Sequence, residues 1–593
     1  MTYYISIQYH LVPTCCRLIL DIVFASYCCI IFLSSCTRYE KNKMCGIWAI
    51  FGSPDDTSIQ CNAAHKITHR GPDAFRIETI HHFPTCCLGF HRLAIVDDLQ
   101  GMQPMRVFRY PHVWLIYNGE IYNHQQLQKE FDFHYATKCD GEAIIHLYAQ
   151  GGIEFAAKHL DGVFSFCLLD TANRKVFLGR DTYGVRPMFR LYNDNGFLAV
   201  CSEAKGLIGL SQEAYSEHVE PFLPGHVETY KLDMLGKASF EERIRFHKIG
   251  ETPAYKTVAE IQDKNEVEKN IRILFEAAVE KRLMAERRIG CLLSGGLDSS
   301  LVASILAKKA KEMKLSYRIQ TFAIGMENSP DLLAARKVAN FLETEHHEVV
   351  FTPEEGIAAL EEVIYHLESY DVTTIRASVG MFLLSKYIKE KTDTTVILSG
   401  EGSDEIAQGY IYFHNAPSGA DADIESKRLC EDLYMFDVLR GDRSTSAWGL
   451  EIRVPFLDHK FSSYYLSLSD SIKQPQKGIE KYLLRSAFDG IDLLPKDILW
   501  RPKEAFSDGV SSKTRSWFEI LQEFICEQIN DSDLESLALT YKHNTPRTKE
   551  ALYYRQIFEK FYPGQGDWIP YYWMPKWTGA TDPSARTLKH YKQ

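Results

Sequence analysis

The sequence has no excess of positive charge. Its 593 residues carry a net charge of −11, and residues 1–43 hold more basic than acidic side chains, so the remainder is more acidic still. Non-specific nucleic-acid binding requires a basic face. We therefore expect no nucleic-acid partner and look instead for small-molecule chemistry.

The sequence also has no CxxC motif. This absence among its 15 cysteines excludes the common zinc and thioredoxin patterns. Their odd number and scattered positions favour reduced, buried thiols in a cytosolic protein, with Cys45 as the exception discussed below. The pattern GxxxxGK[ST] is absent as well, which excludes a Walker-type nucleotide loop.

Long hydrophobic runs are limited to one, LILDIVFASYCCIIFLSS at 18–35. It is near the lower length limit for a membrane span, and Asp21 interrupts it. A cleaved signal peptide is a weaker alternative, because a strongly basic start is lacking. If the run were an anchor, the basic flank after it would hold the body on the cytosolic side. We favour an extension over 1–43 that is absent from or removed in the active protein, with no stable membrane association.

Residues 45–234 are predicted to form a first, strand-rich domain. Short apolar or alternating runs are broken by Gly, Asn and Asp, and helical stretches are expected only at 141–150 and 153–160. The strand segments are WAIF, CCLGFHRLAIV, VWLIY, FSFCLL, KVFLG and GFLAVC. Many strands with few helices favour stacked sheets. A polar linker is expected at 235–255.

Residues 256–577 are predicted to form a second domain of a different class. An amphipathic helix at 265–284 precedes strands at 288–293, 319–326 and 346–351, which alternate with helices at 299–313 and 329–342. This alternation indicates βαβ units and a parallel sheet. Ser329 and Pro330 suit the start of the second of these helices. The polar tail at 578–593 has no assigned role.

The sharpest motif is SGGLDSS at 294–300, between a predicted strand and a predicted helix. Glycines let backbone N–H groups approach a phosphate, and the helix start attracts an anion. Asp298 beside phosphate makes sense with a Mg²⁺ ion between them. The alternative, a glycine-rich turn with an incidental Asp, is weaker for the full heptapeptide. The motif resembles the pyrophosphate loop of the PP-loop ATP pyrophosphatase synthetases, which implies ATP as cosubstrate.

A second strand and turn, TVILSGEGSDE, carries further candidates. We predict that Asp298 and Asp404 share the magnesium ion. Lys503, in WRPKEAFSDG, is a candidate to neutralise departing pyrophosphate, the alternative being an ordinary surface lysine. The predicted ATP-binding residues are Leu292, Ser294, Gly295, Gly296, Asp298, Ser299, Ile324, Ser399 and Gly400.

The first domain contains CGI at 45, RGPD at 70, HRLAIVD at 91, YNGEIYN at 117 and DGE at 140. Together these resemble the class II glutamine amidotransferases, N-terminal-nucleophile hydrolases with a four-layer αββα fold. The resemblance implies that Cys45 attacks glutamine, that Asn118 and Gly119 form the oxyanion hole, and that the remaining residues bind glutamine. These are Arg92, Leu93, Ala94, Ile95, Val96, Glu120 and Asp140. Singly, Arg92 could be a surface ion pair and Asn118-Gly119 a hairpin turn.

The chemistry of Cys45 depends on its own nitrogen. An α-amino group titrates at about 7.7–8.0 and can take the thiol proton, whereas an amide joined to Met44 has no basicity to offer. The active form of this site should therefore begin at Cys45.

An amidotransferase domain followed by a PP-loop domain resembles the glutamine-hydrolysing asparagine synthetases of animals, from Met44 to the C-terminus. The resemblance implies ATP-dependent formation of a β-aspartyl-AMP intermediate, an internal ammonia channel and a homodimer. It implies contacts of Leu292 and Ile324 with adenine, and Glu401 as a general base. Arg440, Arg453 and Asp437 are weaker candidates for holding aspartate.

Three alternatives remain. An ammonia-only ligase, possibly membrane-tethered, would result if residues 1–43 stayed attached and blocked Cys45. A non-enzymatic relative would need damaged loops, yet Asp298, Glu401, Asp404 and Lys503 are all present. A β-lactam-forming relative would have no use for Cys45.

Overall fold

The computed structural model describes residues 45–53, 57–71, 73–96, 101–210, 219–250, 263–503, 509–512 and 515–584. The predictions for 1–43 and for the end of the tail lie outside these ranges, as do residues 251–255 of the expected linker. Within the described residues, no helix combines the length and apolar character needed to cross a membrane.

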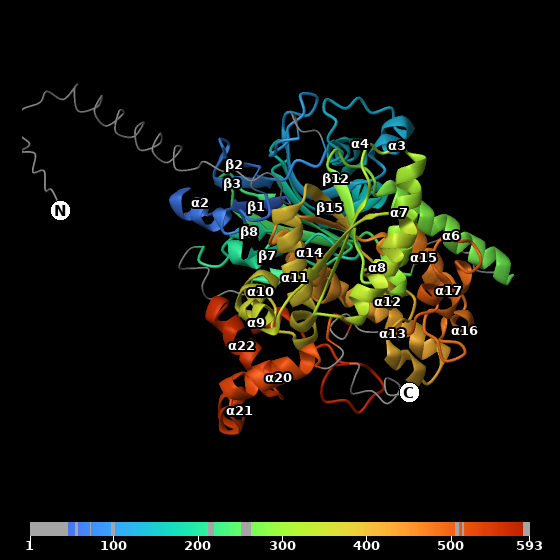
Figure 1. Cartoon of the computed structure of the whole chain (residues 1–593). Helices are drawn as coiled ribbons and strands as arrows, with labels where there is room; N and C mark the ends of the chain where they lie inside the picture. The colour runs from blue at the N-terminus through green and yellow to red at the C-terminus, as the bar shows by residue number, and fades with distance from the viewer. Residues whose placement is uncertain are drawn as a thin grey trace, which may run out of the picture. The chain divides into compact units, whose positions relative to one another are not determined.

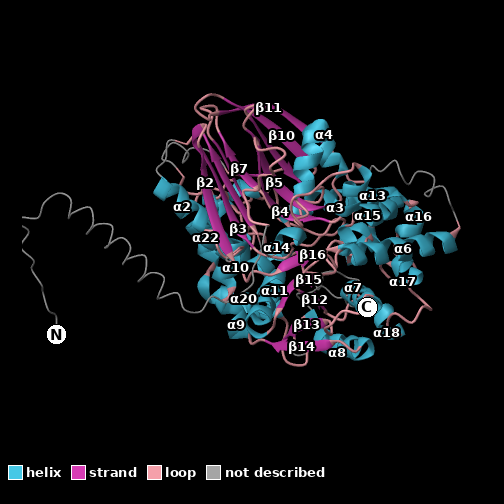
Figure 2. Ribbon diagram, turned by 90° about the horizontal axis from the view of Figure 1, so that it is seen from above, coloured by secondary structure: helices cyan, strands magenta, loops and turns pink. Residues whose placement is uncertain are grey.

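The first half contains two antiparallel sheets, which lie side by side in Figure 2. One sheet has the order β2 (Ala74–Ile80), β3 (Phe83–Arg92), β1 (Gly46–Phe51), β8 (Leu198–Cys201), β7 (Phe189–Tyr192) and β9 (Glu220–Pro221). The other has the order β11 (Ala238–Arg245), β10 (His226–Leu232), β6 (Lys175–Arg180), β5 (Gly162–Asp170) and β4 (Val113–Ile121).

Buried side chains define four layers in this half. Alternate residues of β1 point to opposite faces: Ile47 and Ala49 pack between the sheets against β4, β5 and β6, whereas Trp48 packs outward against α2 (Thr57–His65). The outer face of the second sheet is covered by α3 (His124–Glu130) and α4 (Glu142–His159). The predicted αββα arrangement of stacked sheets is confirmed.

Three details differ from the sequence-based expectation. The two helical stretches at 141–150 and 153–160 form the single helix α4, kinked at Gly152, while α2 and α3 were not foreseen. Residues 238–245, placed in the linker, form strand β11, which pairs with β10 at the edge of a sheet. Its side chains are largely exposed, so its sequence is polar and lacked a clear strand pattern.

The second half is built on a parallel sheet, as predicted. Its order is β14 (Glu345–Val350), β13 (Gln320–Gly325), β12 (Arg288–Leu292), β15 (Thr394–Leu398) and β16 (Glu451–Arg453). In β12, β13 and β15, successive apolar residues are buried on opposite faces of the sheet. The edge strands β14 (EHHEVV) and β16 (EIR) are more polar. The chain adds β13 and then β14 on one side of β12, and then returns to add β15 and β16 on the other side. This reversal separates the loops after β12 and β15, and open parallel sheets bind ligands at such a point.

Helices cover both faces of this sheet (Figure 1). Ser329 caps α8 by accepting a hydrogen bond from Leu332 N, and Pro330 is its first residue, as expected. The helices are α6 (Lys264–Lys281), α7 (Leu297–Glu312), α8 (Pro330–Leu342), α9 (Pro353–Ala358), α10 (Leu360–Leu367), α11 (Val372–Lys391), α12 (Ser403–Ile406), α13 (Gly419–Asp432), α14 (Asp437–Ser446), α15 (His459–Ser467), α16 (Asp470–Lys473), α17 (Tyr482–Ala487), α18 (Lys496–Leu499), α20 (Trp517–Gln528), α21 (Asp531–Leu537) and α22 (Lys549–Phe561).

Candidate active sites

Cys45 immediately precedes β1, and its thiol is hydrogen-bonded to the backbone of Leu93. Its Sγ donates to Leu93 O at 3.3 Å and accepts from Leu93 N at 3.2 Å. Burial raises the pKa of the thiol to about 12, and the charges of Glu451 and Glu120 act in the same direction. At neutral pH this sulfur stays protonated unless a base is supplied beside it.

Asn118 and Gly119 lie on β4, opposite Ser165 and Phe164 of β5. Gly119 has φ +144°, and a Cβ there would lie 2.0 Å from Val163 O, so no other residue fits. The Asn118 Nδ2 is buried and has no hydrogen-bond partner among the described residues. Because buried donors are nearly always bonded, this amide is well suited to meet an oxygen of a ligand.

Two of the three predicted glutamine-binding charges, Arg92 and Glu120, act on the thiol. Arg92 ends β3 and is 8% exposed, and its charge lowers the pKa of Cys45 while that of Glu120 raises it. Asp140 is buried and accepts from the Tyr117 hydroxyl at 2.8 Å and from Ile121 N at 2.6 Å. Both of its oxygens therefore bind protein groups, which fixes the carboxylate rigidly.

Residues 93–96 join this site to the second half of the molecule. Ala94 O accepts from Arg287 Nε at 2.7 Å, and Ile95 O accepts from Glu286 N at 3.0 Å. The side chains of Leu93 and Ile95 belong to the apolar cluster that contains α7. The stretch predicted to bind glutamine is thus also an interface between the two halves.

A buried ionic network, unforeseen from the sequence, lies behind Cys45. Arg70 donates from Nε to Cys45 O at 3.1 Å and pairs with Asp442 of α14 through two bonds of 2.8 and 3.0 Å. It also pairs with Glu203 at 2.7 Å, and Glu203 in turn pairs with Arg443 at 2.8 Å. All four side chains of this network are almost wholly buried. It contributes a fixed contact between the backbone of Cys45 and α14.

The second candidate site is a cavity of about 260 Å³ at the carboxyl ends of β12 and β15. Most residues predicted for the nucleotide and its chemistry line it: Leu292, Ser294, Gly296, Asp298, Ser299, Ile324, Ser399, Gly400, Glu401, Asp404 and Lys503. Gly295 does not, because it faces α8, where an added Cβ would lie 2.4 Å from Ala335 N.

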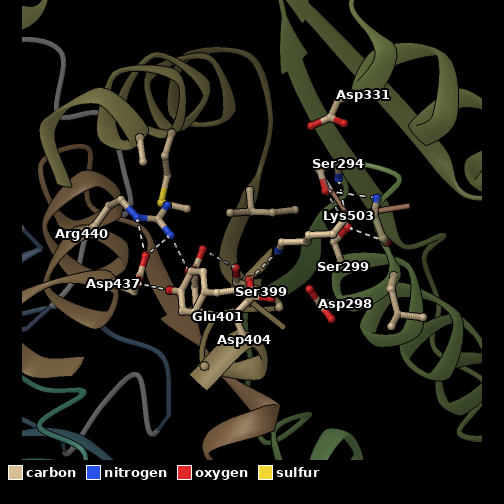
Figure 3. A pocket seen from close by; sticks show the side chains of 18 of the residues that line it. Ser294, Asp298, Ser299, Asp331, Ser399, Glu401, Asp404, Asp437, Arg440 and Lys503 are labelled. Atoms are coloured by element: carbon tan, nitrogen blue, oxygen red, sulfur yellow. Dashed lines mark hydrogen bonds and ion pairs between the residues drawn. The ribbon is translucent and has the colours of Figure 1, made fainter. Parts of the chain in front are cut away.

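Two lysines and two carboxylates form the centre of this cavity. Lys481 Nζ lies 2.7 Å from Asp298 and 2.7 Å from Asp404, and Lys503 Nζ lies 2.6 Å from Asp404. Figure 3 shows Lys503 reaching Asp404 from the opposite side of the cavity to Glu401. The two lysines hold the pKa of Asp404 below its usual range against the opposing effect of burial. Lys481 was missed because it belongs to no recognised motif.

The predicted magnesium ligands suit that ion chemically. Asp298, Asp404 and the Ser403 hydroxyl, which donates to Asp298 at 2.8 Å, form an all-oxygen donor set. Mg²⁺ prefers such donors and takes its remaining ligands from water and phosphate. A bound ion would share the two carboxylates with Lys481.

Glu401 also has a strongly shifted pKa. Burial raises its pKa to about 7, and the charges of Asp437 and Asp404 add to the shift. Arg440 opposes it through a 2.5 Å hydrogen bond and also pairs with Asp437 at 2.9 Å (Figure 3). A carboxyl with a pKa near neutrality can accept a proton at working pH.

Arg453 was a weaker candidate for holding aspartate, and the structure places it apart from the other two candidates. It does not line the cavity; it is fully buried at the amidotransferase side, pairing with Glu451 at 2.7 Å and Glu120 at 3.4 Å. Arg440 and Asp437, named with it, do line the cavity.

Comparison with known proteins matches this two-site arrangement. Residues 44–236 match the glutamine amidotransferase domain family, and residues 270–428 and 420–585 match the asparagine synthase family. The matches define a glutamine amidotransferase fused to an asparagine synthase domain.

Individual relatives identify the family more closely. "Asparagine synthetase [glutamine-hydrolyzing]" of Gallus gallus is 63% identical over 93% of this chain and 99% of its own length, and that of Homo sapiens is 61% identical over the same shares. A solved glutamine phosphoribosylpyrophosphate amidotransferase from B. subtilis is 14% identical, with a TM-score of 0.29 over 51% of this chain and 81% of its own. The chain belongs to the glutamine-hydrolysing asparagine synthetases.

The Arg70–Asp442 pair gives a stability prediction. Asp442→Asn leaves Arg70 buried with a weakened partner, so the free energy of unfolding should fall by about 3–5 kcal/mol, measured by urea denaturation. The control is Glu431→Gln, which removes a half-exposed ion pair with Arg245 and should cost about 1 kcal/mol or less. Equal losses in the two variants would refute the importance of the buried pair.

Proposed function

We propose that this asparagine synthetase consumes ATP and that aspartate is activated in the cavity at β12 and β15. The β-carboxylate of aspartate attacks the α-phosphorus of ATP, forming β-aspartyl-AMP and releasing pyrophosphate. Ammonia then attacks the acyl carbon, and AMP leaves as asparagine forms. The observation that carries this proposal is the convergence of a phosphate-binding loop, two carboxylates and two lysines in one cavity.

The ammonia is proposed to come from glutamine at Cys45. The thiolate attacks the side-chain amide carbon, and the Asn118 amide with the Gly119 N–H stabilises the resulting oxyanion. The unpartnered Asn118 Nδ2 supports this role. Arg92 would bind the α-carboxylate, since its fork matches that group, with Glu120 and Asp140 binding the α-ammonium and side chain. Leu93, Ala94, Ile95 and Val96 would form the wall of the same site.

The base for Cys45 is proposed to be its own α-amino group. The raised thiol pKa means that a nearby proton acceptor is required. Accordingly, residues 1–43 would be absent or removed in the glutamine-dependent enzyme. A chain that retained them would be an ammonia-only synthetase, and the same raised pKa favours this as the second candidate function.

In the cavity, Asp298 and Asp404 would hold magnesium, which offsets the charge on the leaving pyrophosphate. Lys503 would contact the pyrophosphate oxygens, and Glu401 would accept a proton during intermediate formation or from the incoming ammonia. Leu292 and Ile324 would flank adenine, the backbone of Ser399 and Gly400 would contact the nucleotide, and the loop would bind phosphate through Ser294, Gly295, Gly296 and Ser299.

The wider organisation is proposed from the family resemblance. Residues 45–234 would be the amidotransferase domain, 256–577 the synthetase domain and 578–593 a tail, with ammonia passing inside the protein. The enzyme would be a cytosolic homodimer that acts on aspartate, glutamine and ATP, without nucleic acid or a stable membrane attachment. Size measurement in solution tests the dimer.

The two-site division predicts a selective effect of Cys45→Ala. Asparagine formation from glutamine should fall by at least about 10³-fold, because the nucleophile is lost. Formation from ammonium salts should stay within about twofold of the parent. The measurement is asparagine yield with each donor, and Cys61→Ala, a partly buried cysteine elsewhere, serves as control. Equal losses with both donors would contradict separate sites.

The amine base predicts a specific N-terminus. Intact-mass measurement of glutamine-active protein should give a chain that begins at Cys45. Active protein whose Cys45 is still joined to Met44 would contradict the α-amine as base, whereas ammonia-only activity in that form would support the second candidate function.

Because the pKa of Glu401 is raised to about 7, we predict that the pH profile of asparagine formation falls on its acid side. With free ammonia held constant, kcat/KM for aspartate should fall below about pH 7 as Glu401 gains a proton. Glu401→Gln should abolish this acid-side fall and lower asparagine formation by about 10²–10⁴-fold, while glutaminase activity persists. An unchanged acid-side fall in this variant would assign the pH dependence to another group.

A further inference from the structure

Part of the wall of the synthetase cavity comes from residues far along the chain. Trp573, Pro583 and Ser584 line the same cavity as the phosphate loop. The segment that carries them follows α22, and it appears in red beneath α12 and α13 in Figure 1. Residues 578–584 belong to the polar tail for which the sequence suggested no role.

This segment is attached firmly at its start. Trp573 N donates to Asp371 at 2.8 Å, and the Trp573 ring lies 5.3 Å from that of Tyr410, whose hydroxyl donates to Asp437 at 2.9 Å. Trp577 packs against the rings of Tyr412 and Phe413. These contacts fix the chain along one side of the cavity as far as Trp577.

The far end is attached by charge. Arg376 of α11 forms a two-bond pair with Asp582, at 2.9 Å from Nη1 and 2.7 Å from Nη2. The same guanidinium binds Glu550 of α22 at 2.8 and 2.6 Å. Arg376 is 5% exposed and itself lines the cavity, so the pair lies at the wall of the site.

The Asp582 carboxylate also fixes the backbone of the two residues that follow it. Its Oδ1 accepts from Ser584 N at 2.8 Å, which turns the chain so that Pro583 and Ser584 meet the cavity. The Arg376 pair holds the pKa of Asp582 below its usual value although burial opposes this, so the carboxylate stays charged at neutral pH. Bidentate Arg–carboxylate pairs combine strength with fixed orientation.

We propose that Asp582 is a positioning residue that, through its pair with Arg376, holds Pro583 and Ser584 as one wall of the synthetase cavity and keeps water from the activated aspartyl carbon. The inference rests on the proposed function. Without the wall, water attacks the acyl carbon of β-aspartyl-AMP, its oxygen joins the aspartate formed, and AMP leaves. ATP is then consumed without asparagine.

The test is Asp582→Asn, assayed with ammonium as the nitrogen donor. Pyrophosphate released per asparagine formed should rise at least about threefold, and the Kd for ATP should increase about fivefold to tenfold. Asp582→Glu, which keeps the charge on a longer arm, should recover part of both effects. Thr581→Ala, at the exposed neighbouring position, should change neither.

Glutaminase activity of the same Asp582→Asn preparation monitors folding, because the Cys45 site lies in the other half and should be unaffected. Unchanged pyrophosphate ratio and ATP affinity in Asp582→Asn would overturn the proposal. A parallel loss of glutaminase activity would also count against it, since it indicates general destabilisation. If the parent made no asparagine, the proposed function would fail, while the ATP affinity of the variants would still decide whether Asp582 shapes the cavity.

Discussion

The buried pairing of Arg70 with Asp442 ties the two halves of this enzyme together. Arg70 holds the backbone carbonyl of Cys45, and Asp442 lies on α14. Two residues earlier on the same helix, Arg440 binds Glu401 in the synthetase cavity. One helix of ten residues thus carries groups belonging to both sites. Separating a buried ion pair leaves an uncompensated charge and costs stability. These pairs therefore fix the position of α14 relative to both sites.

Charge balance also explains how the synthetase cavity tolerates so many carboxylates. Asp298 and Asp404 share Lys481, and Glu401 and Asp437 share Arg440. Without these cations, mutual repulsion would protonate several of the acids. Glu401 is the one predicted catalytic acid for which compensation is incomplete, and its pKa is accordingly near neutral.

Sequence patterns located the residues that stand in continuous motifs. The predicted phosphate loop, the Ser399–Asp404 turn and Lys503 were named in this way, and most of their residues line one cavity. Lys481 and Arg376 reach the cavity from elements distant in sequence, so only the folded chain brings them there. Strand β11 was missed because an exposed edge strand does not require apolar residues.

Arg453 is a contrasting case, because it stands in a motif and yet does not line the cavity. Its position in GLEIRVPFLD suggested substrate contact, yet it is committed to Glu451, Glu120 and backbone carbonyls between the halves. The sequence around an arginine does not reveal whether its side chain binds a ligand or fills an interface. Arg440 lines the cavity and is also buried, so the two arginines differ in the groups that they contact, which depends on tertiary packing.

The loop at 93–96 has a mechanical consequence. Leu93 touches the sulfur on one side, while Ile95 O is bonded to Glu286 N, two residues before the start of β12. Strand β12 runs from that point directly to Ser294 at the other cavity. A molecule that displaces the loop at Cys45 would therefore either break the hydrogen bond to Glu286 or act on the start of the strand that leads to the predicted phosphate loop.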